Sequence, residues 1–456
     1  MTPREREFHR PFGSYLVWLP FARGSEDERV TNSTERRSIA LMIAHSFFTG
    51  AMTVFFETTA SATFLARLDA RLLPWVYVAA ALVSVIAAGA YAGVRRGFPF
   101  LMRGTVVALL VLALGLRGAL AISDARWVAF GGLVAYRLVS TLSDLEYWAL
   151  ANRIYDAEQA RRLFGLIGTG EVTARLAGSL LVPLVVRALG VRDMLFLSAG
   201  AAVACLLLLE ALLPLAHGPA SVAAPPTPPR RSAFVDALLA LAVLATFGKV
   251  LVDFAFLRQV GSIHRSEAEL ATFLGWFGGA TQLGSLLLRL FVTRPFLARF
   301  GVRSGVLVLP TVHALCCVAI LVAAALHSST GIGLLVIGNQ AFYKVLKHPI
   351  DNASFKVLYQ DLEPGARLGV QVAAEVFFAP IVTGLSGLCM VAMSSVYEPV
   401  RFTVLLLLVF GAWIVTGWRT GHVRSSETII PPSPTETPAC VPDRARAPTC
   451  ARRRGT

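Results

Sequence analysis

Apolar stretches of roughly 20 residues recur along the whole chain, separated by short polar breaks. A helix of that length crosses the hydrocarbon core of a bilayer and satisfies its own backbone polar groups there. The composition agrees, since 55% of the 456 residues are hydrophobic and 15% are charged. The pattern predicts an all-α integral membrane protein with about twelve transmembrane helices, over residues 38–60, 73–94, 101–122, 128–150, 163–186, 193–215, 234–257, 269–292, 303–326, 330–353, 368–393 and 400–418.

A break rich in Pro, Ala and Ser divides these spans into two sets of six. Its sequence, HGPASVAAPPTPPRRSA, is typical of a flexible linker. We therefore expect a cytoplasmic N-terminal segment with an interfacial stretch at 12–21, an N-terminal half, a cytoplasmic linker, a C-terminal half and a disordered basic cytoplasmic tail. These parts cover residues 1–37, 38–216, 217–233, 234–418 and 419–456.

The chain carries a formal net charge of +14. Its arginines are dispersed over short loops and both termini instead of being gathered on one face, so nucleic acid is not an expected partner. The bias of positive charge between alternate loops predicts a multi-pass protein of the inner (cytoplasmic) membrane with both termini in the cytoplasm. The six cysteines match no zinc-binding spacing, and we expect neither a metal nor a cofactor.

The two halves echo each other at an offset of 204 residues, which aligns residues 152–178 with 356–382. The matched positions are Tyr155 with Tyr359, Gly165 with Gly369, Glu171 with Glu375 and Val172 with Val376. Two six-helix halves in the same orientation, joined by a polar linker, are the layout of major facilitator transporters. Such transporters hold their substrate near the bilayer midplane, between the halves.

A charged side chain at the centre of an apolar span costs roughly 2.5–3.5 kcal/mol on insertion scales. Such side chains therefore usually face a partner or a water-filled cavity. Our candidates for substrate binding or gating are Glu171, Arg175, Arg137, Lys249, Asp253, Lys344, Asn339 and Glu375. Glu57 lies in the first span, and the sequence assigns it no role.

Two interpretations of these candidates stay open. Residues four apart share a helix face, so Glu171 with Arg175, and Lys249 with Asp253, can form local ion pairs that only lock or neutralise helices. Alternatively, Glu171 and Glu375 act as a gate or as a proton-titrating pair, while the basic residues line a site for an anion. Asn339 can bond substrate or a neighbouring helix.

Several segments resemble the bacterial and plastid ATP/ADP translocase family. They read YDAEQARRLFGLIGTG, KVLVDFAFLRQV, RPFLARFGVRSGVLVLP, FKVLYQDLEPGARL and PIVTGLSGL, and they are spread over most of the membrane domain. The resemblance implies a major facilitator fold and nucleotide transport. Family members carry basic residues in the first helix of the membrane domain, whereas span one here contains His45 and Glu57 but neither Lys nor Arg.

Taken together, these features predict a secondary transporter that works by alternating access, not an enzyme. The expected solute is a nucleotide, such as ATP or ADP, or another phosphorylated or anionic molecule, moved by exchange or ion coupling. One alternative is a proton-coupled major facilitator transporter of an unrelated solute. The other is a membrane sensor or scaffold, derived from a transporter, that moves nothing. Partners are the lipid bilayer and a small anionic solute; the oligomeric state is open.

Overall fold

The computed structural model describes residues 26–93, 97–155, 157–216, 232–360, 378–393 and 399–427, together with 362, 370 and 374. The elements of the first half are α1 (Glu26–Arg67), η1 (Ala70–Leu72), α2 (Leu73–Gly93), α3 (Phe98–Ile122), α4 (Arg126–Ile154), α5 (Ala157–Ile167), α6 (Thr169–Ala188), α7 (Met194–Leu212) and η2 (Leu213–Leu215). Those of the second half are α8 (Ala233–Ile263), α9 (Glu267–Phe291), α10 (Thr293–Ala325), α11 (Ser329–Leu346), η3 (Lys347–Asp351), α12 (Asn352–Gln360), α14 (Ala379–Ala392) and α15 (Pro399–Glu427).

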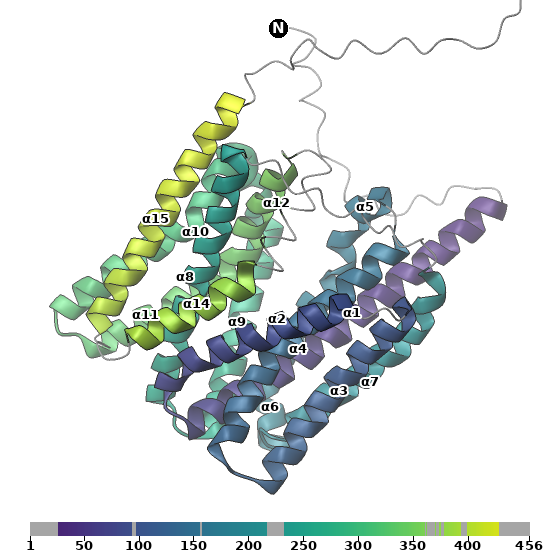
Figure 1. Ribbon diagram of the computed structural model, residues 1–456, viewed down its shortest axis with the longest axis horizontal. Helices are drawn as coiled ribbons and strands as arrows, with labels where there is room; N and C mark the ends of the chain where they lie inside the picture. The colour runs from purple at the N-terminus through teal and green to yellow at the C-terminus, as the bar shows by residue number, and fades with distance from the viewer. Residues whose placement is uncertain are drawn as a thin grey trace, which may run out of the picture.

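The helices pack as two groups, which we call the N-half (α1–α7) and the C-half (α8–α15) (Figure 1). In the N-half, α1 packs against α4, α6 and α7. In the C-half, α8 packs against α11, α14 and α15. Two helix pairs, α6 with α9 and α2 with α14, provide most of the contact between the halves. The predicted all-α fold with two helical halves is therefore confirmed.

The molecule has two ends that differ in how the halves meet. We call the end that holds α5, α12 and the last turns of α15 the terminal end, and the opposite end the far end (Figure 1). Small residues allow close packing toward the far end: a Cβ on Gly387 of α14 would lie 2.6 Å from the carbonyl oxygen of Pro74 in α2, and one on Gly275 of α9 would lie 2.8 Å from Val182 in α6. The halves are thus joined near the far end.

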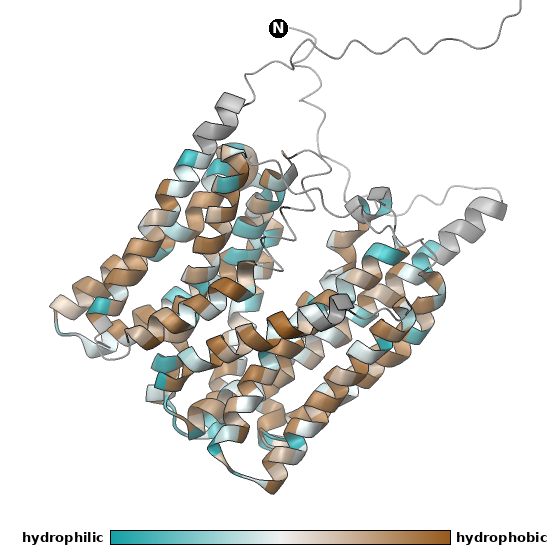
Figure 2. Ribbon diagram, viewed as in Figure 1, coloured by the Kyte–Doolittle hydropathy of each residue, from teal (hydrophilic) through white to brown (hydrophobic). Residues whose placement is uncertain are grey.

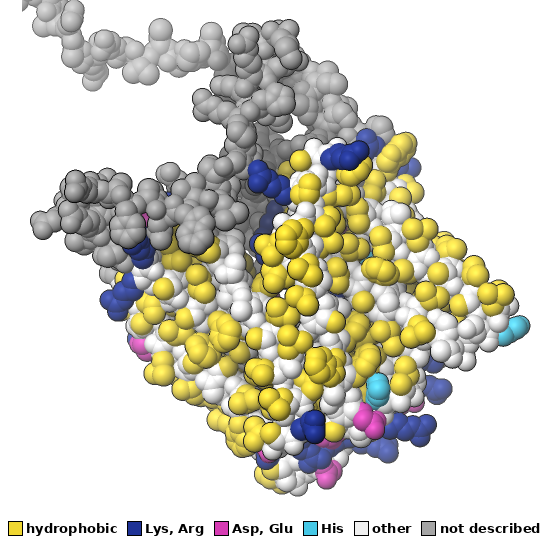
Figure 3. Space-filling model, turned by 180° about the vertical axis from the view of Figure 1, so that it is seen from behind, with side chains coloured by type: hydrophobic (Ala, Val, Ile, Leu, Met, Phe, Trp, Pro, Cys, Tyr) yellow, Lys and Arg dark blue, Asp and Glu magenta, His cyan; other side chains and the backbone are white. Residues whose placement is uncertain are grey.

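The surface of the bundle is apolar around its middle. Large hydrophobic side chains such as Leu82, Leu207 and Leu408 are exposed. Much of the ribbon between the two ends is hydrophobic (Figure 2), and the charged side chains in view gather toward the ends (Figure 3). In the described part of the chain, nine helices are long and apolar enough to cross a membrane. An apolar band of this kind is stable against lipid and not against water, which identifies a multi-pass membrane protein.

Several spans differ in detail from the prediction. Span five is divided at Gly168 into α5 and α6, which places Glu171 in the first turn of α6 instead of deep within a continuous helix. Span nine, predicted over 303–326, is preceded in α10 by a short helical segment that starts at Thr293. Gly301 separates the two with a φ of 76°, a conformation that only glycine adopts without strain. Span ten changes at Lys347–Asp351 into a π-helical turn, a feature frequent at functional sites.

Helix α1 begins at Glu26, well before the predicted residue 38. Its first turns are polar and rich in Glu and Arg, which favour helix without adding to the apolar signal that defines a span. The interfacial stretch at 12–21, most of the linker and the tail beyond residue 427 lie outside the described residues, as does Glu375.

Candidate functional site

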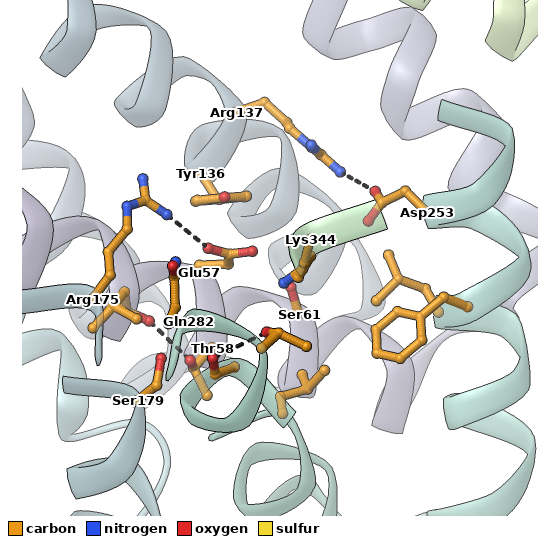
Figure 4. Close-up of a pocket in the computed structure, with 16 residues that line it drawn as sticks. Glu57, Thr58, Ser61, Tyr136, Arg137, Arg175, Ser179, Asp253, Gln282 and Lys344 are labelled. Atoms are coloured by element: carbon orange, nitrogen blue, oxygen red, sulfur yellow. Dashed lines mark hydrogen bonds and ion pairs between the residues drawn. The ribbon is translucent and has the colours of Figure 1, made fainter. Parts of the chain in front are cut away.

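A pocket lies between the two halves (Figure 4). Three N-half helices (α1, α4 and α6) and three C-half helices (α8, α9 and α11) contribute to its wall. The polar side chains that line it are Glu57, Thr58, Ser61, Tyr136, Arg137, Arg175, Ser179, Asp253, Thr281, Gln282 and Lys344. Its volume is about 80 Å³, below the roughly 300–1,000 Å³ of pockets that enclose drug-sized ligands. A large solute would therefore have to widen it.

Asp253 of α8 joins the two halves in this pocket. Its Oδ2 accepts hydrogen bonds from Arg137 Nη2 at 2.7 Å and from the Tyr77 hydroxyl at 2.9 Å, both in the N-half. Gln340 Nε2 lies 3.3 Å from the other carboxylate oxygen. The Arg137 guanidinium also stacks on Tyr77, with its carbon 5.3 Å from the ring centroid. A charge-assisted pair of this kind holds the halves together at pocket depth.

Arg175 of α6 forms ionic contacts with two carboxylates. Its Nε donates to Glu171 Oε1 at 2.8 Å, one helical turn away, and its Nη1 lies 3.8 Å from Glu57 Oε2 on α1. The Tyr136 hydroxyl also makes a hydrogen bond with Glu57. The predicted Glu171–Arg175 pair is therefore formed, and the structure adds Glu57 to it as a third member (Figure 4).

Lys344 of α11 points into the pocket from the C-half (Figure 4). Its ammonium nitrogen lies 5.7 Å from the centroid of the Phe277 ring. Among the described residues, no carboxylate lies within ion-pairing distance of it. Its charge interacts with Asp253 at longer range. Within that part of the chain, Lys344 is the basic group in the pocket wall that forms no close ion pair.

Lys249 of α8 lies one turn from Asp253 on the terminal side of the pocket. The predicted Lys249–Asp253 ion pair is not formed, because Asp253 is bonded to Arg137. Lys249 is exposed although it lies near the middle of a long helix, and it interacts electrostatically at longer range with Asp253 and, more weakly, with Asp144 of the N-half. Since it shares a helix face with a pocket residue, it faces the space between the halves and not lipid.

The far end carries a second set of ionic contacts between the halves. Glu267, at the start of α9, lies 2.8 Å from Arg67 Nε and 3.4 Å from Arg192 Nε, both in the N-half. Asp124 bonds the same two arginines at 2.9 and 3.1 Å. Together with the Arg137–Asp253 pair, this network links the two halves at the pocket and at the far end.

Most of the predicted candidates gather in or beside the pocket. Arg137, Arg175, Asp253 and Lys344 line it, and Glu171 and Lys249 lie close by. Asn339 does not, because its Oδ1 lies 2.6 Å from His313 Nδ1 on α10, which is a contact between helices. Among the described residues, no group of three His, Cys, Asp or Glu side chains is placed to hold a metal ion.

The sequence prediction missed the other polar residues of the pocket, and also Tyr77, which bonds Asp253. The missed pocket residues are Glu57, Tyr136, Gln282 and the four hydroxyl residues Thr58, Ser61, Ser179 and Thr281. A signal was available for Glu57, which is an acidic residue within an apolar span and precedes Ser61 on the same helix face. The aromatic and amide residues carry no such signal, because they occur in any membrane helix as packing or lipid-facing groups.

The fold and the position of the pocket define a multi-pass helical membrane protein with the major facilitator fold. Solved structures that share it include the nucleoside transporter NupG (D323A mutant), with TM-score 0.55 and 13% identity over 85% of this chain and 99% of that one. A bacterial homologue of the iron transporter ferroportin, in an inward-facing state, has TM-score 0.59 and 12% identity over 85% and 98% of the two chains. The D-xylose-proton symporter has TM-score 0.59 and 13% identity over 84% of this chain and 96% of that one.

Sequence comparisons add nothing to this likeness, since no protein-family model and no curated protein matches the chain. At these identities the structural likeness establishes the fold and leaves the solute open.

Proposed function

We propose that this protein is a secondary transporter that moves a small anionic solute across the inner membrane by alternating access, with both termini in the cytoplasm. The observation that carries the proposal is the basic side chain of Lys344, which points into a pocket between two helical halves and forms no close ion pair with the described residues. A cation in that position is stable next to an anion, and the bilayer interior offers it none.

The ionic contacts support a cycle of the kind expected for this architecture. In the state described here, the far side is closed by the Arg137–Asp253 pair and by the contacts of Glu267. Opening the far side requires both sets of contacts to break while the halves approach each other at the terminal end. On that side Lys249 of the C-half would then come closer to Asp144 of the N-half.

A nucleotide is the first candidate solute, because the resemblance to the ATP/ADP translocases names it. Arginine and lysine are the side chains that bind phosphate most often, and Arg175 and Lys344 present both types to the pocket. Smaller anions such as inorganic phosphate or a monocarboxylate fit the same chemistry and require less widening of the pocket.

The test is uptake by liposomes that contain the purified protein. Labelled ATP, ADP, inorganic phosphate and L-lactate are supplied outside, each with the same unlabelled anion inside, over a range of mildly acidic to mildly basic pH. We expect one of them to enter by exchange. In Lys344→Gln, uptake should fall roughly tenfold or more, because a hydrogen bond to a charged group contributes about 1.5–3 kcal/mol.

Lys356→Gln is the matched control, since Lys356 is exposed on α12 and away from the pocket. An equal loss of anion uptake in Lys344→Gln and Lys356→Gln would contradict the role of Lys344. Binding of a probe without any uptake would contradict transport and favour the sensor or scaffold alternative.

A further inference from the structure

The two walls of the pocket carry surplus charges of opposite sign. On the N-half wall, Glu57 and Glu171 share the guanidinium of Arg175, with contacts of 3.8 and 2.8 Å, so one negative charge there has no cation of its own. On the C-half wall, Lys344 forms no close ion pair with the described residues. Glu57 and Lys344 both point into the pocket and form no ion pair with each other (Figure 4). A negative and a positive group thus face the same space from opposite halves.

The charges of the described residues in and beside the pocket sum to zero. They are three carboxylates and three basic groups: Glu57, Glu171, Asp253, Arg137, Arg175 and Lys344. Arg137 and Asp253 neutralise each other across the pocket. On the terminal side, Lys249 and Asp144 add one charge of each sign. In a site of low dielectric constant, an uncompensated ion added to a neutral cluster is unfavourable, whereas a molecule that carries both charges finds a partner for each.

We infer that the solute of this pocket is a zwitterion, a small α-amino acid whose carboxylate binds Lys344 and whose ammonium group binds Glu57. The inference rests on the proposed transport function and narrows its solute, because the anionic group then comes with an ammonium group on the same molecule. Complementary charges of this kind determine which solutes a site accepts, since like charges placed together repel each other.

Glu57 has acceptor capacity left for an ammonium group. Its Oε2 lies 3.8 Å from Arg175 Nη1, farther than a hydrogen bond, and the Tyr136 hydroxyl is its hydrogen-bond partner. Glu171 is held more closely, by Arg175 Nε at 2.8 Å. Asp253 accepts two bonds from the N-half, at 2.7 and 2.9 Å. A carboxylate offers about four lone-pair sites, so Glu57 can accept the N–H groups of a solute and keep its bond with Tyr136.

Lys344 and the uncharged part of the wall suit the rest of such a molecule. The lysine ammonium supplies three N–H donors to a carboxylate, and the amide of Gln282 lines the same space. The apolar side chains that complete the wall are Val54, Phe256, Leu257 and Leu274. In a pocket of about 80 Å³, they favour a solute with a small apolar substituent, as in alanine.

Binding can be tested with L-alanine and L-lactate, which match in size and differ by an ammonium group in place of a hydroxyl. A ligand that binds the folded state raises the temperature of unfolding. We expect L-alanine to stabilise the purified protein in detergent at concentrations at least roughly tenfold below those needed for L-lactate, because a second ionic contact adds to the first. Equal stabilisation by the two compounds, or none by L-alanine, would overturn the inference.

Two variants separate the roles of the charged residues. Lys344→Gln should weaken binding of both compounds alike, since both carry the carboxylate. Glu57→Gln should weaken binding of L-alanine alone and so abolish its roughly tenfold advantage. Glu57→Asp retains the charge and should keep a preference for L-alanine, as should Glu269→Gln, whose carboxylate is exposed on α9. An unchanged preference in Glu57→Gln would overturn the inference.

Liposomes give a second readout. Uptake of labelled L-alanine is compared with that of L-lactate, ATP, ADP and inorganic phosphate, each with the same unlabelled compound inside. We expect L-alanine to exchange at least roughly tenfold faster than L-lactate. Faster exchange of any of the four anions would overturn the zwitterion and leave transport in place. Stabilisation by L-alanine without uptake of any compound would overturn transport and leave the zwitterion site standing.

Discussion

At the residue scale, the site depends on which acid meets which base. Asp253 could form an ion pair either with Lys249, one turn before it on α8, or with a base across the pocket. It bonds Arg137 of the other half. The guanidinium reaches it together with the Tyr77 hydroxyl, so the carboxylate gains two close donors that Lys249 alone would not supply. The pair therefore reports on the relative position of the halves.

Replacing Asp253 tests this pair. Asp253→Asn leaves Arg137 without its acidic partner. The two side chains are 26% and 21% exposed, so the cost lies below the roughly 3–5 kcal/mol of a fully buried pair. We expect the closed far side to be weakened and anion exchange in liposomes to fall at least roughly tenfold. Asp236→Asn, at the exposed start of the same helix, should leave exchange unchanged. Normal exchange by Asp253→Asn would contradict a role for the pair in the cycle.

At the element scale, glycines determine how closely the helices of the two halves pack. Gly387 on α14 faces the backbone of α2, and Gly275 on α9 faces α6. The two contacts lie toward the far end, where the halves are joined. Close packing of backbones is a main source of helix association in a bilayer, since lipid is as apolar as the side chains it replaces.

Gly387→Ala places a methyl group 2.6 Å from the Pro74 carbonyl oxygen, which forces α2 and α14 apart. We expect thermal unfolding in detergent to shift by the equivalent of about 1–3 kcal/mol toward lower stability, as for overpacked cores. Gly411→Ala, where nothing lies within 4 Å of the new carbon, is the control and should be neutral or slightly stabilising. Equal behaviour of the two variants would show that the contact between α2 and α14 does not limit stability.

At the scale of the whole molecule, the ionic contacts are arranged by end. Glu267 is the C-half residue of the far-end network, and it holds Arg67 and Arg192 of the N-half. The pocket is thus separated from the far side by several contacts that must break together. Individually, partly exposed ion pairs contribute about 0–1 kcal/mol, so a network of them can close a pathway without making the closure irreversible.

Glu267→Gln should shift the molecule toward the state that is open at the far end. In a cysteine-free background, a cysteine in place of the pocket residue Ser61 should react several-fold faster with an impermeant thiol reagent added at the far side. The neighbouring Glu269→Gln is the control, since Glu269 is exposed and forms no ion pair with the described residues. Unchanged labelling in Glu267→Gln would mean that the network does not hold the far side closed.

The sequence by itself determined the all-helical membrane fold with two halves, and it named the charged residues Arg137, Arg175, Asp253 and Lys344 that line the pocket. Apolar length is a local property, and an intramembrane charge such as Arg137 or Lys344 is unusual enough to be noticed in isolation. A position four residues away on one helix is also local, which is why the Glu171–Arg175 pair was predicted correctly.

Only the tertiary structure decided the partners across helices. Helical spacing predicts neighbours within one helix only, and it predicted Lys249 as the partner of Asp253. Packing of the two halves instead brings Arg137 and Tyr77 to Asp253. The same holds for Glu57, whose importance depends on an arginine of another helix. Charge pairs between helices depend on distances that the packing of the whole bundle sets, and a sequence pattern contains only the distances along one helix.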